Sequence, residues 1–346
     1  MKKNLVVIGF GGMGGWHVNH ALESDVVHLL GVYDIKPERN EAARARGIFA
    51  YDSLEAVLAD PRVDMVTIAI PNDQHEEVAI KALQAGKHVL SEKPVTLSLE
   101  SLDRMIAASK KAGKIFSVHQ NRRWDVDYLA MQKIRDSGEI GEVLNIESRI
   151  HGSRGIPSDW RGEKKYGGGM LYDWGVHLID QVLLIMGYDV KSVRCDFDHI
   201  TNQEVDDGFQ LTIRFANGSR AYVEVGTYNF IAMPRFYMRC QKGTALIEDW
   251  REKCKVVKCK YWHENDVLPV QTAAGLTKTM APRDSVTTDT YEIERPASDV
   301  HDYYRNFVAA MDGKATQIVT HEQMRTVLKV IMTAFQSVEE GRTIEW

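Results

Sequence analysis

The stretch Leu5-Val6-Val7-Ile8-Gly9-Phe10-Gly11-Gly12-Met13-Gly14, close to the start of the chain, decides the fold. It begins as an apolar run typical of a buried strand and continues as a G-x-G-x-x-G turn. Gly9 permits the tight turn, Gly11 lets the backbone approach a pyrophosphate, and Gly14 lets a helix pack closely on the strand. That helix, expected over residues 16–22, would present free N–H groups and its positive dipole end to phosphates. We predict that the whole loop, with Phe10, Gly12 and Met13, binds a dinucleotide.

A second strand, expected over residues 26–33, is followed at once by Asp34. An acidic residue at this place accepts hydrogen bonds from the adenosine ribose hydroxyls and repels a 2′-phosphate. Asp34 therefore favours NAD over NADP. Lys36 and Arg39 weaken that argument, because either could reach a phosphate. As an alternative role, Asp34 only caps the helix expected over residues 37–46.

Strands and helices continue to alternate up to His119. Further strands are expected over residues 63–70, 89–90 and 115–119, and helices over residues 75–85 and 99–112. Alternation of this kind is typical of a parallel, doubly wound sheet. We assign residues 1–122 to a Rossmann α/β domain that binds NAD or NADP.

The tripeptide Glu92-Lys93-Pro94 directly follows the strand expected at residues 89–90. Lys93 therefore stands at the carboxyl end of a strand, the edge of an open parallel sheet at which ligands bind. A lysine there is a candidate for chemistry rather than for packing.

Residues 123–346 are predicted to form a substrate-binding and oligomerisation domain of the α+β class, built on an open, largely antiparallel sheet with few helices. Strands are expected over 143–150, 209–215, 220–225, 236–241 and 244–248, one helix over 129–137, and a long polar loop over 271–290. Asn217-Gly218 and Lys242-Gly243 are hairpin signals. One face of such a sheet is free to pair subunits, so we expect a homo-oligomer, a dimer or tetramer.

Gly167-Gly168-Gly169 comes shortly before Asp173 and His177, which are four residues apart and would share one face of a helix. A carboxylate beside an imidazole raises its basicity and can orient it. The triglycine lets the backbone come close to a ligand or to the other domain. Taken alone, an ordinary helical Asp–His pair at a domain edge is the alternative.

Three segments together resemble one known family. They are Ile70-Pro71-Asn72-Asp73-Gln74-His75, Ala82-Leu83-Gln84-Ala85-Gly86-Lys87-His88-Val89 and Glu92-Lys93-Pro94. The chain resembles the Gfo/Idh/MocA family, the group of glucose–fructose oxidoreductase and inositol dehydrogenase. The resemblance covers nearly the whole chain and is strongest up to Asp180.

The resemblance implies a catalytic set of Lys93, Asp173 and His177, with histidine commonly the base; whether Lys93 or His177 is the base stays open. It also implies a cis bond between Lys93 and Pro94. Besides the glycine loop and Asp34, the expected cofactor-binding residues are Pro71, Asn72, His75, Glu92, Lys93, Asn121, Trp160 and Arg161. The expected substrate-binding residues are Lys93, Arg122, Trp124, Tyr166, Asp173 and His177. Aromatic faces beside arginines and carboxylates suit a polyhydroxylated ring, although each tryptophan could equally be core.

These observations predict an NAD-dependent oxidoreductase that transfers a hydride between nicotinamide and a hydroxyl-bearing carbon of a sugar, polyol or glycoside. One alternative is redox-neutral, NAD-dependent glycoside cleavage or sugar rearrangement through a transient keto-sugar. The other is a regulator that senses NAD without catalysis, which the intact Lys93, Asp173 and His177 disfavour.

The composition argues against several other classes of protein. The chain has 346 residues, a formal net charge of −5 and 44% hydrophobic residues, which gives no electrostatic case for binding nucleic acid or an anionic membrane. No apolar run reaches a membrane span, and the run after Lys2-Lys3 is too short for a signal sequence. Four cysteines suit a reduced, cytoplasmic protein. Cys254, Cys259 and His263 match no standard zinc spacing, so no metal is expected.

Overall fold

A five-stranded parallel sheet forms the centre of the first domain in the computed structural model, which describes residues 1–261 and 268–346. Its strands lie in the order β2-β1-β3-β4-β5. They are β1 (Lys3–Ile8), β2 (Val27–Tyr33), β3 (Met65–Ile68), β4 (His88–Ser91) and β5 (Phe116–Val118). The helices between them are α1 (Gly12–Leu22), α2 (Pro37–Ala45), α3 (Leu54–Ala59), α4 (His75–Gln84) and α5 (Leu99–Ala112). All four residues of β3 are buried, as expected for a central parallel strand covered on both faces. The predicted doubly wound sheet is confirmed.

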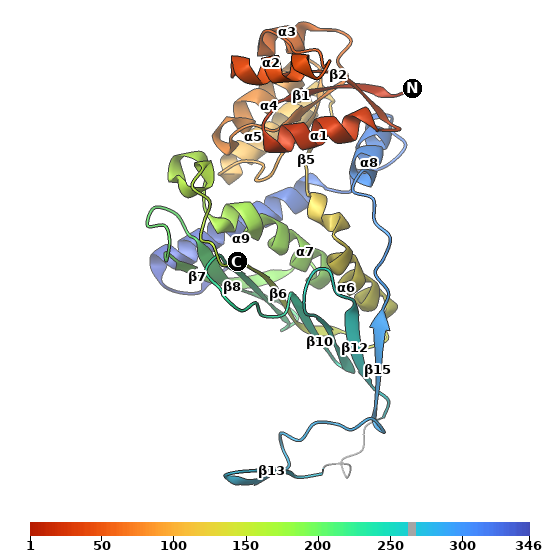
Figure 1. Ribbon diagram of the computed structural model, residues 1–346, viewed down its shortest axis with the longest axis vertical. Helices are drawn as coiled ribbons and strands as arrows, with labels where there is room; N and C mark the ends of the chain where they lie inside the picture. The colour runs from red at the N-terminus through yellow and green to blue at the C-terminus, as the bar shows by residue number, and fades with distance from the viewer. Residues whose placement is uncertain (262–267) are drawn as a thin grey trace.

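One helix from the far end of the chain joins this domain. Helix α8 (Asp302–Met311) places Tyr303, Tyr304 and Phe307 in the same hydrophobic cluster as strands β1 to β5. Figure 1 shows α8, in blue, beside the red and orange elements of the first domain. The chain therefore returns to its first domain after passing through its second sheet.

The second sheet has nine strands in the order β15-β12-β11-β10-β6-β9-β8-β7-β16. The strands are β6 (Val143–His151), β7 (Val190–Asp198), β8 (Gly208–Phe215), β9 (Arg220–Gly226), β10 (Phe236–Cys240), β11 (Gly243–Ile247), β12 (Cys254–Cys259), β15 (Thr288–Ile293) and β16 (Ile344–Glu345). Neighbours run antiparallel except β6 and β9, which are parallel. Both predicted hairpins, β8–β9 and β10–β11, are present.

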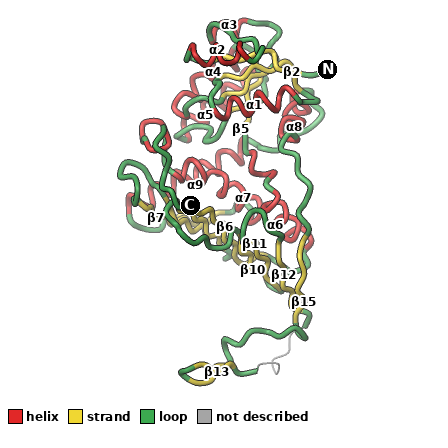
Figure 2. Tube along the Cα trace, viewed as in Figure 1, coloured by secondary structure: helices red, strands yellow, loops and turns green. Residues whose placement is uncertain are grey.

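Three helices cover one face of this sheet: α6 (Val126–Ser137), α7 (Val176–Met186) and α9 (His321–Glu340). Figures 1 and 2 show α7 and α9 between the nine-stranded sheet and the first domain. Helix α9 starts with a capping box, in which Thr320 and Gln323 satisfy each other's backbone N–H groups. No helix in the described ranges is long and apolar enough to span a bilayer.

The predicted polar loop over residues 271–290 is partly wrong. It contains most of a small hairpin, β13 (Val270–Thr272) with β14 (Gly275–Thr277), and the start of β15. These strands escaped prediction because they are largely exposed, so no buried apolar residues alternate along them. The helices α8 and α9 were also not predicted, since only a helix over residues 129–137 was expected in this part of the chain.

Candidate active site

The glycine loop leaves the amino terminus of α1 open to an anion. Gly9 has a positive φ of 94°, and a Cβ there would lie 2.2 Å from the carbonyl oxygen of Ala69. A Cβ on Gly14 would lie 1.9 Å from the carbonyl oxygen of Gly9, so both glycines are required. Gly11 precedes α1 without a side-chain cap, and the first turn holds no acidic residue. The first N–H groups of α1 are thus free for a phosphate, and the loop fits a dinucleotide cofactor.

Asp34 connects this loop to the turn after β2. One of its carboxylate oxygens, Oδ2, accepts the N–H of Phe10 at 2.7 Å, and the other accepts the N–H of Lys36 at 2.9 Å. Arg39 donates to Oδ2 at 3.1 Å, and its guanidinium lies beside Gly11. Asp34 does not cap α2, whose N-cap is Lys36. A carboxylate suited to a ribose and a cation suited to a 2′-phosphate therefore stand side by side.

Lys93 links the two domains through Asp173. The peptide bond between Lys93 and Pro94 is cis, as the resemblance implied. The Nζ atom of Lys93 donates to the carboxylate and to the backbone carbonyl of Asp173, both at 2.8 Å. Arg161 Nε donates to the second carboxylate oxygen of Asp173 at 3.2 Å. Burial raises the pKa of Asp173, but the charges of Lys93 and Arg161 outweigh it and the pKa is lowered.

Within the described ranges, Asp173 and His177 are not hydrogen-bonded to each other. The turn Leu171–Gly175 is π-helical, and α7 begins only at Val176. The carboxylate of Asp173 bonds to Lys93 and Arg161. Nδ1 of His177 is buried and has no partner within the described ranges. Burial and the charges of Lys93 and Arg122 hold the pKa of His177 well below its usual value, so its imidazole is neutral.

The triglycine brings backbone of the second domain against the first, as predicted. A Cβ on Gly167 would lie 2.5 Å from the side chain of Leu97. The side-chain amide of Asn72 donates to the carbonyl oxygens of Tyr166 and Gly167, both at 3.2 Å. At Gly169, with a φ of 104°, a Cβ would lie 2.1 Å from a carboxylate oxygen of Asp206. Only glycine fits these approaches.

Trp160 and Tyr166, which were predicted at the site, and Trp174, which was not, differ in their contacts from the predicted Trp124. The Arg122 guanidinium lies 4.0 Å from the centre of the Trp174 ring, and that of Arg161 lies 4.6 Å from the centre of the Trp160 ring. Tyr166 is half-buried next to the triglycine. Trp124 instead packs against Tyr303 of α8, with ring centres 5.7 Å apart, which supports the core alternative for it.

Three predicted cofactor-binding residues lie around the ends of β3 and β5. Pro71 precedes a short 3₁₀ turn at Asn72–Gln74, and Asn121 opens another at Asn121–Trp124. His75 is fully buried, and its two ring nitrogens lie 3.0 Å from the carbonyl oxygen of Pro94 and 2.9 Å from that of Ile70. His75 thus joins the segment after β3 to the segment that carries Lys93.

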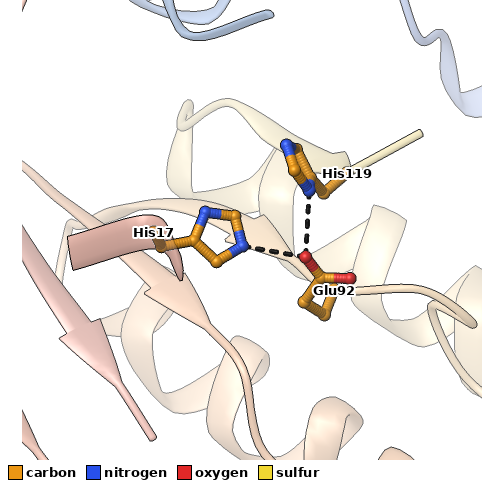
Figure 3. Close-up of side chains that lie close together, drawn as sticks. All are labelled: His17, Glu92 and His119. Atoms are coloured by element: carbon orange, nitrogen blue, oxygen red, sulfur yellow. Dashed lines mark hydrogen bonds and ion pairs between the residues drawn. The ribbon is translucent and has the colours of Figure 1, made fainter. Parts of the chain in front are cut away.

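The predicted residues did not include a cluster beside Lys93. His17 of α1 and His119, which follows β5, both lie against one carboxylate oxygen of Glu92 (Figure 3). Each pair is separated by a long stretch of sequence, so no local pattern could have found it. The ligand atoms of these three residues lie within 4.8 Å of one another, close enough to hold a metal ion. Of the other metal combination considered, Cys254 is buried at the start of β12, Cys259 ends that strand, and His263 lies outside the described residues.

A glycine loop open to a dinucleotide, next to a lysine, a carboxylate and a neutral imidazole, defines a two-domain Rossmann oxidoreductase. Comparison with known families agrees. The model described as "Oxidoreductase family, NAD-binding Rossmann fold" matches residues 3–120, and that of the GFO/IDH/MocA C-terminal domain matches residues 128–246. The two matches span more than half of the sequence, and the chain belongs to the Gfo/Idh/MocA family of NAD(P)-dependent oxidoreductases.

Individual relatives support the same assignment. The crystal structure of an NAD-binding protein from Listeria innocua is 45% identical with a TM-score of 0.96, covering 100% of this chain and 99% of that one. The scyllo-inositol 2-dehydrogenase (NADP(+)) IolW of Bacillus subtilis is 27% identical over 344 residues, 98% of this chain and 94% of the relative. An uncharacterised oxidoreductase of Schizosaccharomyces pombe is 36% identical over 183 residues, and this chain spans about half the length of that relative.

Proposed function

We propose that the protein is an NAD-dependent dehydrogenase that oxidises a hydroxyl-bearing carbon of a sugar, polyol or glycoside. The observation that carries the proposal is the hydrogen bond of Lys93 Nζ to Asp173, together with His177, whose pKa is lowered by burial and by the charge of Lys93, so that its imidazole is neutral. The similarity to IolW, named as an inositol dehydrogenase, supports a polyhydroxylated substrate.

The glycine loop and Asp34 would hold NAD, which would supply the acceptor for a hydride from the hydroxyl-bearing carbon. Lys93 Nζ donates a hydrogen bond to the substrate hydroxyl oxygen and so holds it in place. His177 takes the hydroxyl proton on a ring nitrogen, since a neutral imidazole is a ready proton acceptor. Asp173 keeps the Lys93 ammonium and the Arg161 guanidinium together, and it can accept a neighbouring substrate hydroxyl. Arg122 and Trp174 offer a cationic and an aromatic face for the sugar ring.

NAD is the proposed cofactor because Asp34 offers a carboxylate where a 2′-phosphate would have to lie. Arg39 is the competing influence, and IolW is named as an NADP enzyme. The dissociation constants of NAD and NADP, measured by calorimetry for the wild type and for Asp34→Ala and Arg39→Ala, test this choice. We expect Asp34→Ala to weaken NAD, and Arg39→Ala to weaken NADP more than NAD. Unchanged NAD affinity in Asp34→Ala would contradict the assignment.

We also propose a homo-oligomer that pairs through the face of the nine-stranded sheet opposite α6, α7 and α9. Along β6, Ile146 and Ser148 point toward the helices, so Glu147 and Arg149 point to the other face. There Arg149 pairs with Glu147 and Glu224, and both signs of charge suit contact with a second copy. Light scattering of the purified protein tests this.

The free thiols of its cysteines support a cytoplasmic location.

A panel of sugars, inositols and glycosides with NAD and NADP tests the activity itself. Absorbance of the reduced nicotinamide and NMR of the products are read together. A dehydrogenase forms one reduced cofactor for each product, whereas a redox-neutral enzyme forms product with none accumulating. Binding of NAD without turnover of any substrate would favour a regulator.

A further inference from the structure

The buried cluster at Glu92 is joined by several hydrogen bonds, while Nε2 of His119 has no partner in the described ranges. Glu92 Oε1 lies 2.8 Å from Nε2 of His17 and 2.9 Å from Nδ1 of His119 (Figure 3). The other oxygen, Oε2, accepts the backbone N–H of Lys93 at 3.1 Å. Tyr304 of α8 reaches the far side of His17, with its hydroxyl 2.8 Å from Nδ1. One carboxylate thus joins α1, the ends of β4 and β5, and α8.

The ionised carboxylate requires a proton on the ring nitrogen of each imidazole that faces it. A carboxylate only accepts hydrogen bonds, so it faces Nε2–H of His17 and Nδ1–H of His119. The bare Nδ1 of His17 then accepts the hydroxyl hydrogen of Tyr304, whose oxygen can accept from Thr67 at 3.0 Å. These hydrogen bonds account for the grouping of the three residues without a metal ion.

Burial and the interactions within the cluster together decide which of its groups are ionised. Burial alone would raise the pKa of Glu92, but His119 and His17 outweigh it and hold that pKa well below its usual value. Burial lowers the pKa of His17 to about 4 against the opposing effect of Glu92, with His119 and His20 lowering it further. Glu92 is therefore a carboxylate and His17 is neutral at physiological pH.

None of these side chains is open to a ligand. His17 and His119 have no exposed surface, Tyr304 is 1% exposed and Glu92 is 5% exposed. Any effect on the reaction must pass through a residue that does reach the site, and Glu92 bonds directly to the backbone of Lys93.

We propose that His17, His119 and Tyr304 are positioning residues for Lys93: they hold the Glu92 carboxylate in one orientation, and Glu92 in turn fixes the Lys93 backbone. This inference rests on the proposed role of Lys93. It gives Glu92 a role different from the cofactor binding predicted from the resemblance. It also makes α8, from the far end of the chain, part of the support of the site.

Substitutions that keep or remove a single N–H test the proposal kinetically. His17→Leu and His119→Leu remove a donor to Glu92, and we expect kcat to fall about ten- to a hundredfold, because small displacements of a reacting group are costly. In His17→Gln and His119→Asn the side-chain amide nitrogen takes the place of the donating ring nitrogen, and we expect most of kcat to return. The dissociation constant of NAD should stay within about twofold in all four. Equal losses in the leucine and amide variants would overturn the proposal, as would weaker NAD binding with unchanged kcat.

A second measurement needs neither substrate nor cofactor. In protein labelled with ¹⁵N-histidine, nitrogen shifts at pH 7 report which ring nitrogen is protonated. We expect Nε2–H for His17 and Nδ1–H for His119. Tyr304→Phe removes the donor to His17 Nδ1 and should move the His17 titration midpoint upward by about one pH unit, since that bond stabilises the neutral ring.

Tyr303→Phe is the matched control for Tyr304→Phe. Tyr303 is its buried neighbour on α8, but its hydroxyl bonds to Ser117 and to the carbonyl oxygen of Val118. We expect Tyr303→Phe to leave the His17 midpoint unchanged. Finding the opposite tautomers, or equal His17 titration midpoints in Tyr304→Phe and Tyr303→Phe, would overturn the proposed positioning of Glu92. If no substrate is turned over, the proposed function fails. The tautomers would still test, independently of it, whether these residues hold Glu92 as proposed.

Discussion

Two carboxylates lie beside Lys93, and the protein holds them in opposite ways. Glu92, the preceding residue, is enclosed in the first domain, where two imidazoles and one backbone N–H occupy it. Asp173 comes from the second domain, and its partners are the cationic side chains of Lys93 and Arg161. The side chain of Asp173 is 14% exposed and that of Arg161 29% exposed.

The difference teaches which carboxylate can take part in chemistry. Glu92 has its donors fixed by buried residues, so a ligand could gain a bond from it only by breaking the cluster. Asp173 is paired with two partly exposed cations, so a substrate hydroxyl can approach it more easily than it can approach Glu92. Lys93 belongs to both: its backbone is held by Glu92 and its ammonium by Asp173.

The largest expected effect is that of Lys93→Met. Removing a group that donates to the reacting oxygen should lower kcat by about 10²- to 10⁴-fold with little change in NAD affinity. Steady-state kinetics and calorimetry measure the two quantities.

Lys87→Met is the matched control, because Lys87 stands at the opposite, amino end of β4 and donates to the carbonyl oxygen of Asp60. We expect it to reduce stability and to leave kcat within about threefold, since ligands bind at the carboxyl ends of strands. Equal losses of kcat in the two variants would show that the carboxyl end of β4 matters no more for the reaction than its amino end.

Asp173→Asn should follow in size. It keeps the shape of the side chain but removes the charge that orients Lys93, and we expect kcat/KM to fall by about a hundredfold. Asp159→Asn is the control: Asp159 pairs with Arg161 at 2.9 Å but does not contact Lys93 in the described interactions. A similar loss of kcat/KM in both variants would show that the effect of Asp173 is exerted through Arg161 rather than through Lys93.

Glu92→Gln should lower stability in addition to loosening the hold on the Lys93 backbone. The amide nitrogen of glutamine cannot accept a hydrogen bond, so at least one of the three buried donors loses its partner, at a cost of about 1–3 kcal/mol in the free energy of unfolding. Urea denaturation measures it. In Glu76→Gln, which breaks a more exposed pair with Arg104, we expect a loss below about 1 kcal/mol. If Glu92→Gln were as stable as Glu76→Gln, the cluster would not be tightly held.

The fold was predictable because its signals are local. The apolar run before Gly9, the turn residues and the alternation of strands and helices each occupy a few neighbouring positions. Lys93 and the triglycine were found in the same way, from a strand end and from three residues that lack a Cβ. Helix α8 shows the limit of such signals: its apolar face looks the same whichever domain it packs on, and only the structure places it on the first.

The parts of the site that escaped prediction depend on geometry between distant residues. The spacing of Asp173 and His177 suggested a pair, but the carboxylate of Asp173 bonds to Lys93 of the first domain, which no local pattern indicates. His17, His119 and Tyr304 come from α1, the end of β5 and α8, so nothing in the neighbourhood of any one of them indicates the others. Long-range hydrogen bonds of buried polar residues are what sequence patterns cannot supply.

Asp206 extends the comparison to a carboxylate with neither imidazole nor cation. Its Oδ2 accepts the N–H of Leu171 at 2.7 Å, and no ion pair reaches it in the described ranges. Burial raises its pKa from 3.8 to about 8. The folded state therefore holds a proton that the unfolded state has released between about pH 4 and pH 8, and this contribution to stability is present below that range and lost as the pH rises through it.

Asp206→Asn, which mimics the protonated form, should remove that dependence. Between pH 6 and pH 8 the wild type should lose up to about 1.4 kcal/mol of unfolding free energy per pH unit relative to the variant. Urea denaturation at four pH values measures the difference. Asp207→Asn is the control: backbone and side-chain bonds from Thr201 help to lower the pKa of Asp207, so its contribution is lost only at acid pH. Parallel curves for the wild type and Asp206→Asn would mean that Asp206 is ionised in the fold, and that backbone N–H groups alone can hold a buried carboxylate in its charged form.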